Sequence, residues 1–174
     1  FRLGEILLSA TNTLEEGESR MKSLVREFPE APEAREAQLR LAAALFEAGR
    51  YERAADAYQI YIESFGETGR GLDALDGRAR ALFMLGRFGE AANLYQKAHD
   101  TATNTLRKAE SLYRAADAVV ADGRFRHAAQ LFRSVNQLYS ESPIAPRALF
   151  QSADALERAG DPAGAEGGFR QTAE

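Results

Sequence analysis

One ten-residue stretch returns along this chain at a fixed interval, and that interval limits the folds open to it. GRYERAADAY, from Gly49 to Tyr58, is followed by GRFGEAANLY, GRFRHAAQLF and GDPAGAEGGF. The first glycines are Gly49, Gly86, Gly123 and Gly160, each 37 residues after the one before. A fixed period of this length indicates a repeat array, in which each unit buries its apolar surface against its neighbours. We therefore predict stacked repeats and not one central core.

Composition narrows the classes of function. Apolar residues make up 45% of the chain and charged residues 28%, which is typical of a folded protein and excludes a disordered one. The net charge of -4 supplies no general basic field, so nucleic acid is not an expected partner. Cysteine is absent, which removes disulfides, thiolate catalysis and cysteine metal sites. No apolar run approaches the ~20 residues of a membrane span.

The spacing of apolar residues predicts two helices in each unit. Ala54, Tyr58, Tyr61 and Phe65 lie three or four residues apart, which places them on one side of an amphipathic helix. We predict an all-α fold of about five helix-turn-helix repeats in one continuous solenoid. The expected repeats are 1–34 (degenerate), 35–71, 72–108, 109–145 and 146–174 (degenerate or truncated). In the first, FRLGEILLSA forms a helix and Asn12 takes the place of the turn glycine.

The connectors between repeats differ in their helix-breaking residues. Pro29 and Pro32 separate the first two repeats, and SESPIAP separates the last two. The connector DTATNTLRKAE has no proline, and Ala102 stands where the other connectors have an aromatic residue. We expect this junction to be the softest in the array.

The residues at fixed repeat positions resemble the tetratricopeptide repeat (TPR). The glycine is followed by an aromatic residue, an alanine and a second aromatic residue, and each first helix carries a small residue. The matching residues are Gly49, Tyr51, Ala54 and Tyr58; Gly86, Phe88, Ala91 and Tyr95; Gly123, Phe125, Ala128 and Phe132; and Ala42, Ala79, Ala116 and Ala153. The resemblance covers nearly the whole chain and implies a right-handed superhelical α-solenoid. Its first helices would line a concave groove that binds a peptide or a partner's helix. Pro162, in place of an aromatic residue, makes the last repeat the most divergent.

The period of 37 departs from the family's common 34, and the surplus lies in the connector. This departure and the run FPEAPEAREAQLRLAAALFEAGRYERAADAY resemble a subgroup found in bacterial envelope proteins. The subgroup includes the outer-membrane-assembly lipoprotein and the Tol-Pal-associated periplasmic coordinator. The resemblance favours the bacterial periplasm or cell envelope, with the cytoplasm as the alternative.

Family geometry also indicates which first-helix residues face the groove. The predicted positions are Leu39, Ala43 and Phe46; Asp76, Arg80 and Phe83; Tyr113, Asp117 and Val120; and Phe150 and Asp154. The aromatic residues could anchor a partner or could pack between neighbouring first helices. The charged residues could orient the partner by hydrogen bonds or could be solvated. Arg80 is the one clear cation in this row, so we do not expect recognition of an acidic C-terminal tail.

The sequence shows no arrangement that suggests catalysis or a cofactor. His99 and His127 lack ligand partners at metal spacing, and a solvated or half-buried role is favoured for both. GETGRG, from Gly66 to Gly71, lacks the Lys-Ser/Thr ending of a phosphate-binding loop, so it is a connector. We predict a protein that is not an enzyme and has no cofactor.

The sequence therefore predicts a scaffold that binds a protein or peptide partner in its groove. One alternative is a structural or oligomerising subunit that uses convex faces and the ends of the array. Another is the regulatory repeat domain of a larger protein.

Overall fold

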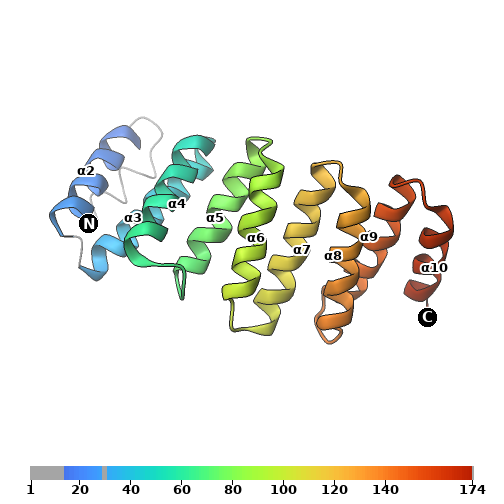
Figure 1. Ribbon diagram of the computed structural model, residues 1–174. Coiled ribbons are helices and arrows are strands. Elements are labelled where there is room, and N and C mark those ends of the chain that lie inside the picture. Colours follow the sequence, from blue (N-terminus) through green and yellow to red (C-terminus); the bar gives the residue numbers. More distant parts are fainter. Residues whose placement is uncertain (1–13, 29–30, 174) are drawn as a thin grey trace. The chain divides into compact units, whose positions relative to one another are not determined.

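The computed structural model describes residues 14–28 and 31–173, and every regular element in that part of the chain is an α-helix (Figure 1). The chain divides into two compact units, Phe1–Leu85 and Gly86–Glu174. The first contains α2 (Leu14–Glu27), α3 (Pro32–Glu47), α4 (Tyr51–Phe65) and α5 (Gly71–Met84). The second contains α6 (Phe88–Thr101), α7 (Thr105–Ala121), α8 (Phe125–Leu138), α9 (Ala145–Arg158) and α10 (Pro162–Ala173). The predicted all-α fold of consecutive helix pairs is confirmed. The helix expected over residues 1–10 and the turn at Asn12 lie outside the described residues.

A glycine in the left-handed backbone conformation follows α3, α5, α7 and α9. The φ angles of Gly49, Gly86, Gly123 and Gly160 are +71°, +76°, +78° and +77°. A side chain with a Cβ atom is disfavoured at such angles, which explains why glycine recurs there. After Gly49, the amide of Arg50 donates a hydrogen bond to the carbonyl oxygen of Leu45 at 2.9 Å. The turn glycines thus end each first helix and allow the second to begin two residues later.

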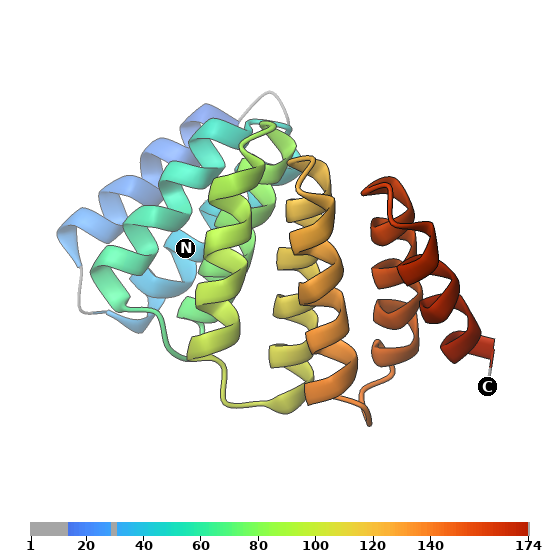
Figure 2. The ribbon, with the colours of Figure 1, turned by 45° about the vertical axis from the view of Figure 1, so that its right-hand side comes forward.

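First and second helices form two layers in the second unit. Figure 2 shows α7 and α9 lying behind α8 and α10. The first helices α7 and α9 contact one another in the second unit, and α3 and α5 do so in the first unit. Each unit therefore has a side that is built from first helices alone.

The residues at fixed repeat positions form the core between these helices. Ala42, Ala79, Ala116 and Ala153 of the first helices are fully buried, as are Ala54, Ala91 and Ala128 of the second helices. Tyr58, Tyr95 and Phe132 are also buried. The small residues allow the helix backbones to approach, and the rings fill the space that remains.

Close contacts join each second helix to its neighbours. Tyr58 of α4 packs against Gly77 of α5, so closely that a Cβ atom at Gly77 would lie 2.3 Å from Tyr58 Cζ. Gln38 Nε2 donates a hydrogen bond to the carbonyl oxygen of Ala57 at 2.7 Å, and Ser152 Oγ donates one to that of Ala129 at 2.9 Å. These buried polar side chains are satisfied by carbonyl groups of the facing helix.

A buried carboxylate connects α2 to α4. Glu18 pairs with Lys22 of its own helix at 2.6 Å and with Arg53 of α4. Because Glu18 is almost inaccessible, loss of either partner would leave a less compensated buried charge.

The connector without proline is packed and capped, and its softness relative to the other connectors stays a prediction. Ala102 is only 3% exposed, and α6 and α7 pack together within one compact unit. The Asn104 side chain accepts a hydrogen bond from the amide of Arg107 at 3.1 Å and so caps the start of α7. A small residue and a helix cap together replace the aromatic residue and the proline. The division of the chain into two units falls between Leu85 and Gly86.

Gly77→Ala should destabilise the protein by about 1–3 kcal/mol, because the added methyl group would overlap the Tyr58 ring. This cost should exceed the gain of up to about 1 kcal/mol that alanine brings to a helix. Gly167→Ala in α10 is the matched control, since its Cβ atom would meet nothing within 4 Å. Its free energy of unfolding should rise slightly. Urea denaturation followed by circular dichroism tests both, and a stabilised Gly77→Ala protein would contradict the packing described.

Candidate partner-binding surface

The candidate surface is the first-helix face, defined as the side of α3 and α5 in the first unit, and of α7 and α9 in the second, that carries the predicted residues. In the first unit these are Leu39, Phe46, Asp76, Arg80 and Phe83; in the second they are Tyr113, Asp117, Phe150 and Asp154. Within each helix they are spaced by three, four or seven residues and therefore share one side. The two units are considered separately.

An aromatic and cationic cluster lies on the first unit's face. The Phe46 ring is partly exposed at the end of α3 and meets the Tyr51 ring edge-on, with centroids 5.3 Å apart. The guanidinium carbon of Arg80, on α5, lies 4.7 Å from the Phe46 ring centroid. This is the geometry of a cation–π contact. Arg80 itself remains exposed, so its charge is held in a defined place and is accessible.

Charges also surround the hydroxyl of Tyr58 beneath this cluster. Burial raises the pKa of Tyr58, the positive charge of Arg80 lowers it, and Asp76 raises it. Arg80 and Asp76 therefore both lie near the same buried ring, one helical turn apart on α5.

The other two predicted residues of the first unit differ in exposure. Leu39 is 7% exposed and belongs to the core. Phe83 is partly exposed near the end of α5. Leu39 therefore offers a partner little surface, whereas Phe83 remains accessible.

In the second unit, Tyr113 is a core residue. It is 3% exposed, and its ring meets that of Phe132 of α8 edge-on at 5.1 Å. The guanidinium carbon of Arg147, on α9, lies 5.2 Å from its ring centroid. The Tyr113 ring thus packs between helices and is not exposed as an anchor for a partner. The exposed group at this point of the face is Arg147, which lies over the Tyr113 ring.

Asp117 lies one turn after Tyr113 and is partly buried. Burial raises its pKa to about 6, and the positive charges of Arg147 and Arg114 oppose that shift. Tyr113 and Asp117 of α7 and Arg147 of α9 thus form one polar cluster between neighbouring first helices.

Phe150 is the most exposed of the predicted aromatic residues. It is 51% exposed on α9, and its ring lies 5.4 Å from that of Phe169 of α10. Asp154, one turn later, is partly exposed. This part of the face therefore offers an aromatic ring and a carboxylate side by side.

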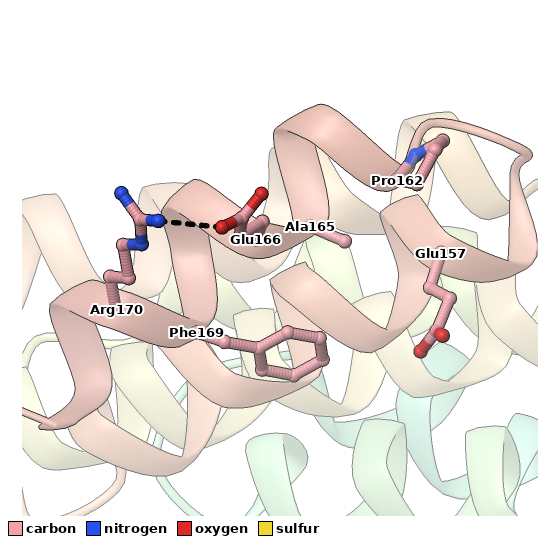
Figure 3. Close-up of a pocket in the computed structure, with 6 residues that line it drawn as sticks. All are labelled: Glu157, Pro162, Ala165, Glu166, Phe169 and Arg170. Atoms are coloured by element: carbon pink, nitrogen blue, oxygen red, sulfur yellow. Dashed lines mark hydrogen bonds and ion pairs between the residues drawn. The ribbon is translucent and has the colours of Figure 1, made fainter.

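An open hollow of about 430 Å³ lies next to Phe150, where the end of α9 meets α10. We call it the α10 hollow; its lining is Glu157, Pro162, Ala165, Glu166, Phe169 and Arg170. Figure 3 shows the Phe169 ring along one side, with the Glu166–Arg170 ion pair (2.6 Å) at its rim. The hollow is mainly apolar at its base and charged at its edge.

Sequence reasoning missed Arg147, Glu157 and Phe169. Arg147 and Glu157 lie three residues before and seven after Phe150, the same helical spacing that selected the predicted row, so this signal could have found both. Phe169 occupies the repeat position of the buried Tyr58, Tyr95 and Phe132, yet it is partly exposed, and no further helix covers it among the described residues. No sequence motif marks the hollow.

His99 is more engaged than the sequence suggested. Its Nδ1 lies 2.8 Å from an Asp100 carboxylate oxygen, and its Nε2 lies 2.7 Å from the Tyr139 hydroxyl. This contact joins the ends of α6 and α8. Within the described residues, no group of three or more acidic or histidine side chains is arranged to hold a metal ion. No helix in that same part of the chain has the length and apolar character needed to cross a bilayer.

Comparison with known proteins identifies the repeats. The family model for the tetratricopeptide repeat matches residues 1–67 and 107–173. A search of curated proteins returned no match.

Solved structures share the fold at low sequence identity. A putative kinesin light chain of Podosopora anserina with nearly identical TPR-like repeats has a TM-score of 0.70 and 20% identity, over 98% of this chain and 90% of that one. MamA from Desulfovibrio magneticus RS-1 has a TM-score of 0.69 and 15% identity, over 98% and 89%. A tetratricopeptide repeat protein from Parabacteroides merdae has a TM-score of 0.69 and 19% identity, over 99% and 66%. At these identities the likeness concerns the fold alone.

Asp117→Asn should stabilise the protein at neutral pH. Because the folded-state pKa of Asp117 is raised from 3.8 to about 6, its stabilising contribution is present below about pH 4 and is lost as the pH rises through about 6. We expect the substitution to raise the free energy of unfolding by about 1–2 kcal/mol at pH 7.5, allowing for solvent screening, and by little near pH 4. Urea denaturation of both proteins at the two pH values measures this, and an equal difference at both would contradict it.

Proposed function

Because the chain belongs to the tetratricopeptide repeat family, we propose that it is a non-catalytic scaffold that binds a peptide or helix of a partner protein on its first-helix face. Tetratricopeptide repeats serve as scaffolds for protein–protein interaction, and what is proposed for this chain is the surface and the mode of binding.

The exposure of Phe150 is the observation that carries the proposal. The Phe150 ring is 51% exposed on α9, and the partly exposed Asp154 carboxylate lies one turn later, so an apolar anchor and a charged group share one side of this helix. Aromatic residues and arginine are the side chains that most often contribute strongly to interfaces. The first unit supplies the second kind of group, since Arg80 is exposed and held over Phe46.

These groups would contribute to binding in two ways, through apolar contact and through hydrogen bonds. In the first unit, Phe83 would supply apolar contact area, and Asp76 and Arg80 would orient a bound segment through hydrogen bonds. In the second unit, Phe150 would supply the apolar contact area and Asp154 the orienting hydrogen bond. An arginine already positioned on a ring loses less side-chain freedom on binding than a free one.

A bacterial envelope assembly is the finer part of the proposal. It is supported by the proline-containing connector after Phe28, by the period of 37 residues and by the absence of cysteine. Fractionation of the native host, with the protein detected by antibody, tests the compartment. Recovery in the cytoplasmic fraction would remove this part and leave the scaffold function intact.

Site-specific photocrosslinking tests the binding face. A photoreactive amino acid at Arg80 or at Phe150 should capture a partner protein in the native host, because each position lies on the first-helix face of its own unit. The matched controls are the exposed second-helix positions Asp56 in the first unit and Arg133 in the second, where capture should be absent.

Substitution at the same positions should weaken the complex. Arg80→Glu and Phe150→Ala should each lower the affinity for the captured partner by about tenfold or more, which corresponds to about 1.4 kcal/mol. Capture at Asp56 and Arg133 alone would instead support a structural or oligomerising module that uses its second helices.

A further inference from the structure

A buried hydroxyl group on the first-helix face of the second unit lacks a regular hydrogen bond. The Tyr113 side chain is 3% exposed, and its hydroxyl oxygen makes no hydrogen bond of regular geometry with the described residues. Burial raises the pKa of this hydroxyl, Asp117 raises it further, and Arg147 and Gln151 lower it, so these three side chains lie around it. Most buried polar atoms in folded proteins are paired, so the unpaired hydroxyl points to a group that is supplied from outside.

The charges around this hydroxyl are of both signs. Asp117 and Asp154 occupy one repeat position, 37 residues apart, on α7 and α9. Arg147 is exposed, with its guanidinium carbon 5.2 Å from the Tyr113 ring centroid, and Arg114 directly follows Tyr113 in the chain. Burial raises the pKa of Asp117 to about 6 against the opposing charges of Arg147 and Arg114. A partner's cation would meet the two arginines and an anion the two carboxylates, so this part of the face favours neither charge.

A side-chain amide matches such a mixed environment. It carries a carbonyl acceptor and an NH₂ donor on neighbouring atoms and has no net charge. Because the Tyr113 hydroxyl lies below the surface, a group that reaches it must stand on a side chain, which disfavours the partner's backbone. Arg147 lies over the ring but is exposed, so its long side chain can move aside without disturbing the packing of the helices.

We propose that the side chains of Tyr113, Asp117, Arg147 and Gln151, here called the Tyr113 cluster, bind an asparagine or glutamine side chain of the partner segment. The amide NH₂ group donates to the Asp117 carboxylate and to the Tyr113 hydroxyl oxygen, and the amide carbonyl oxygen accepts from Arg147. This inference rests on the proposed function, because the same segment would cover Phe150, three residues after Arg147 on α9. The partner's amide thus supplies the hydrogen bond that the buried hydroxyl lacks.

Selection of short random peptides, displayed on phage, against the full chain tests the preference directly. We expect the enriched peptides to share one asparagine or glutamine position. A synthetic peptide of this set should lose affinity by about tenfold or more when that residue is replaced by aspartate, lysine or leucine, because a site built to bond an amide rejects groups that cannot complete its hydrogen bonds. Fluorescence anisotropy of the labelled peptide measures the affinity.

Tyr113→Phe separates a binding role from a structural one, because it removes only the hydroxyl group. Binding of the amide peptide should weaken by about threefold or more. The free energy of unfolding in urea should stay the same or rise, since the hydroxyl makes no regular hydrogen bond within the described residues. The peptide with leucine in place of the amide should bind Tyr113→Phe and the unmodified chain equally, which would show that the amide and the hydroxyl are coupled.

Two arginine variants form a matched pair. Arg147→Ala should weaken binding of the amide peptide by about tenfold, because the carbonyl oxygen of the amide loses its donor. Arg133→Ala, at an exposed arginine of the second helix α8, should change the affinity by less than about twofold.

Enriched peptides that share a charged residue, or no residue, at this position would overturn the inference, as would equal binding of the amide peptide to Tyr113→Phe and to the unmodified chain. If those peptides still lose affinity with Phe150→Ala, only the amide assignment fails and the proposed function stands. Peptides that bind independently of both Phe150 and Arg80, or no enriched peptide at all, would count against the proposed function as well.

Discussion

The packing of a second-helix aromatic ring against a neighbouring first helix is the contact on which each unit depends. Tyr58 is pressed against Gly77 in the first unit, and Phe132 is fully buried beside Tyr113 in the second. A large ring at this point requires small residues around it, which is why fully buried alanines recur on both helices of each pair. The helices are held together by shape more than by polar contacts, and the few buried polar groups, such as Ser152, bond to carbonyl oxygens that the packing brings near.

This arrangement leaves one side of the first helices available for recognition, and arginine residues organise that side. Arg80 lies over Phe46 and Arg147 over Tyr113, so that in each unit a cation on one first helix rests on a ring of the preceding one. Such contacts contribute about 0.5–1 kcal/mol at exposed sites. Their larger consequence is that long, flexible side chains are positioned before a partner arrives. The Tyr113 ring packs in the core and the Phe46 ring packs at the turn, whereas the guanidinium groups above them are exposed on the surface.

The same geometry produces a different kind of surface where no further helix covers a second helix among the described residues. On α8 the ring position is fully buried under α9, whereas on α10 Phe169 lines an open hollow. The residues differ accordingly, because Glu166 stands in the place of Ala129. The same repeat position is thus a buried core position on α8 and a partly exposed one on α10.

The sequence by itself determined the helices, the turns and the core. Glycine is needed at Gly49 for a local reason, the left-handed backbone, and the three-and-four spacing of Ala54 and Tyr58 reports which side of one helix is apolar. The observed helix Tyr51–Phe65 contains all four residues of the apolar side predicted from that spacing. These properties depend on neighbours in the chain, so the local pattern records them.

Only the tertiary structure decided which surface residues come together. It placed Arg147 over Tyr113, buried Leu39, left Phe150 half exposed, buried Ala102 and made Asn104 a helix cap. Each of these outcomes depends on helices that are distant in sequence, on how far a side chain reaches and on whether another helix covers it. A repeat register assigns residues to sides of a helix, but exposure is a property of the packed neighbours.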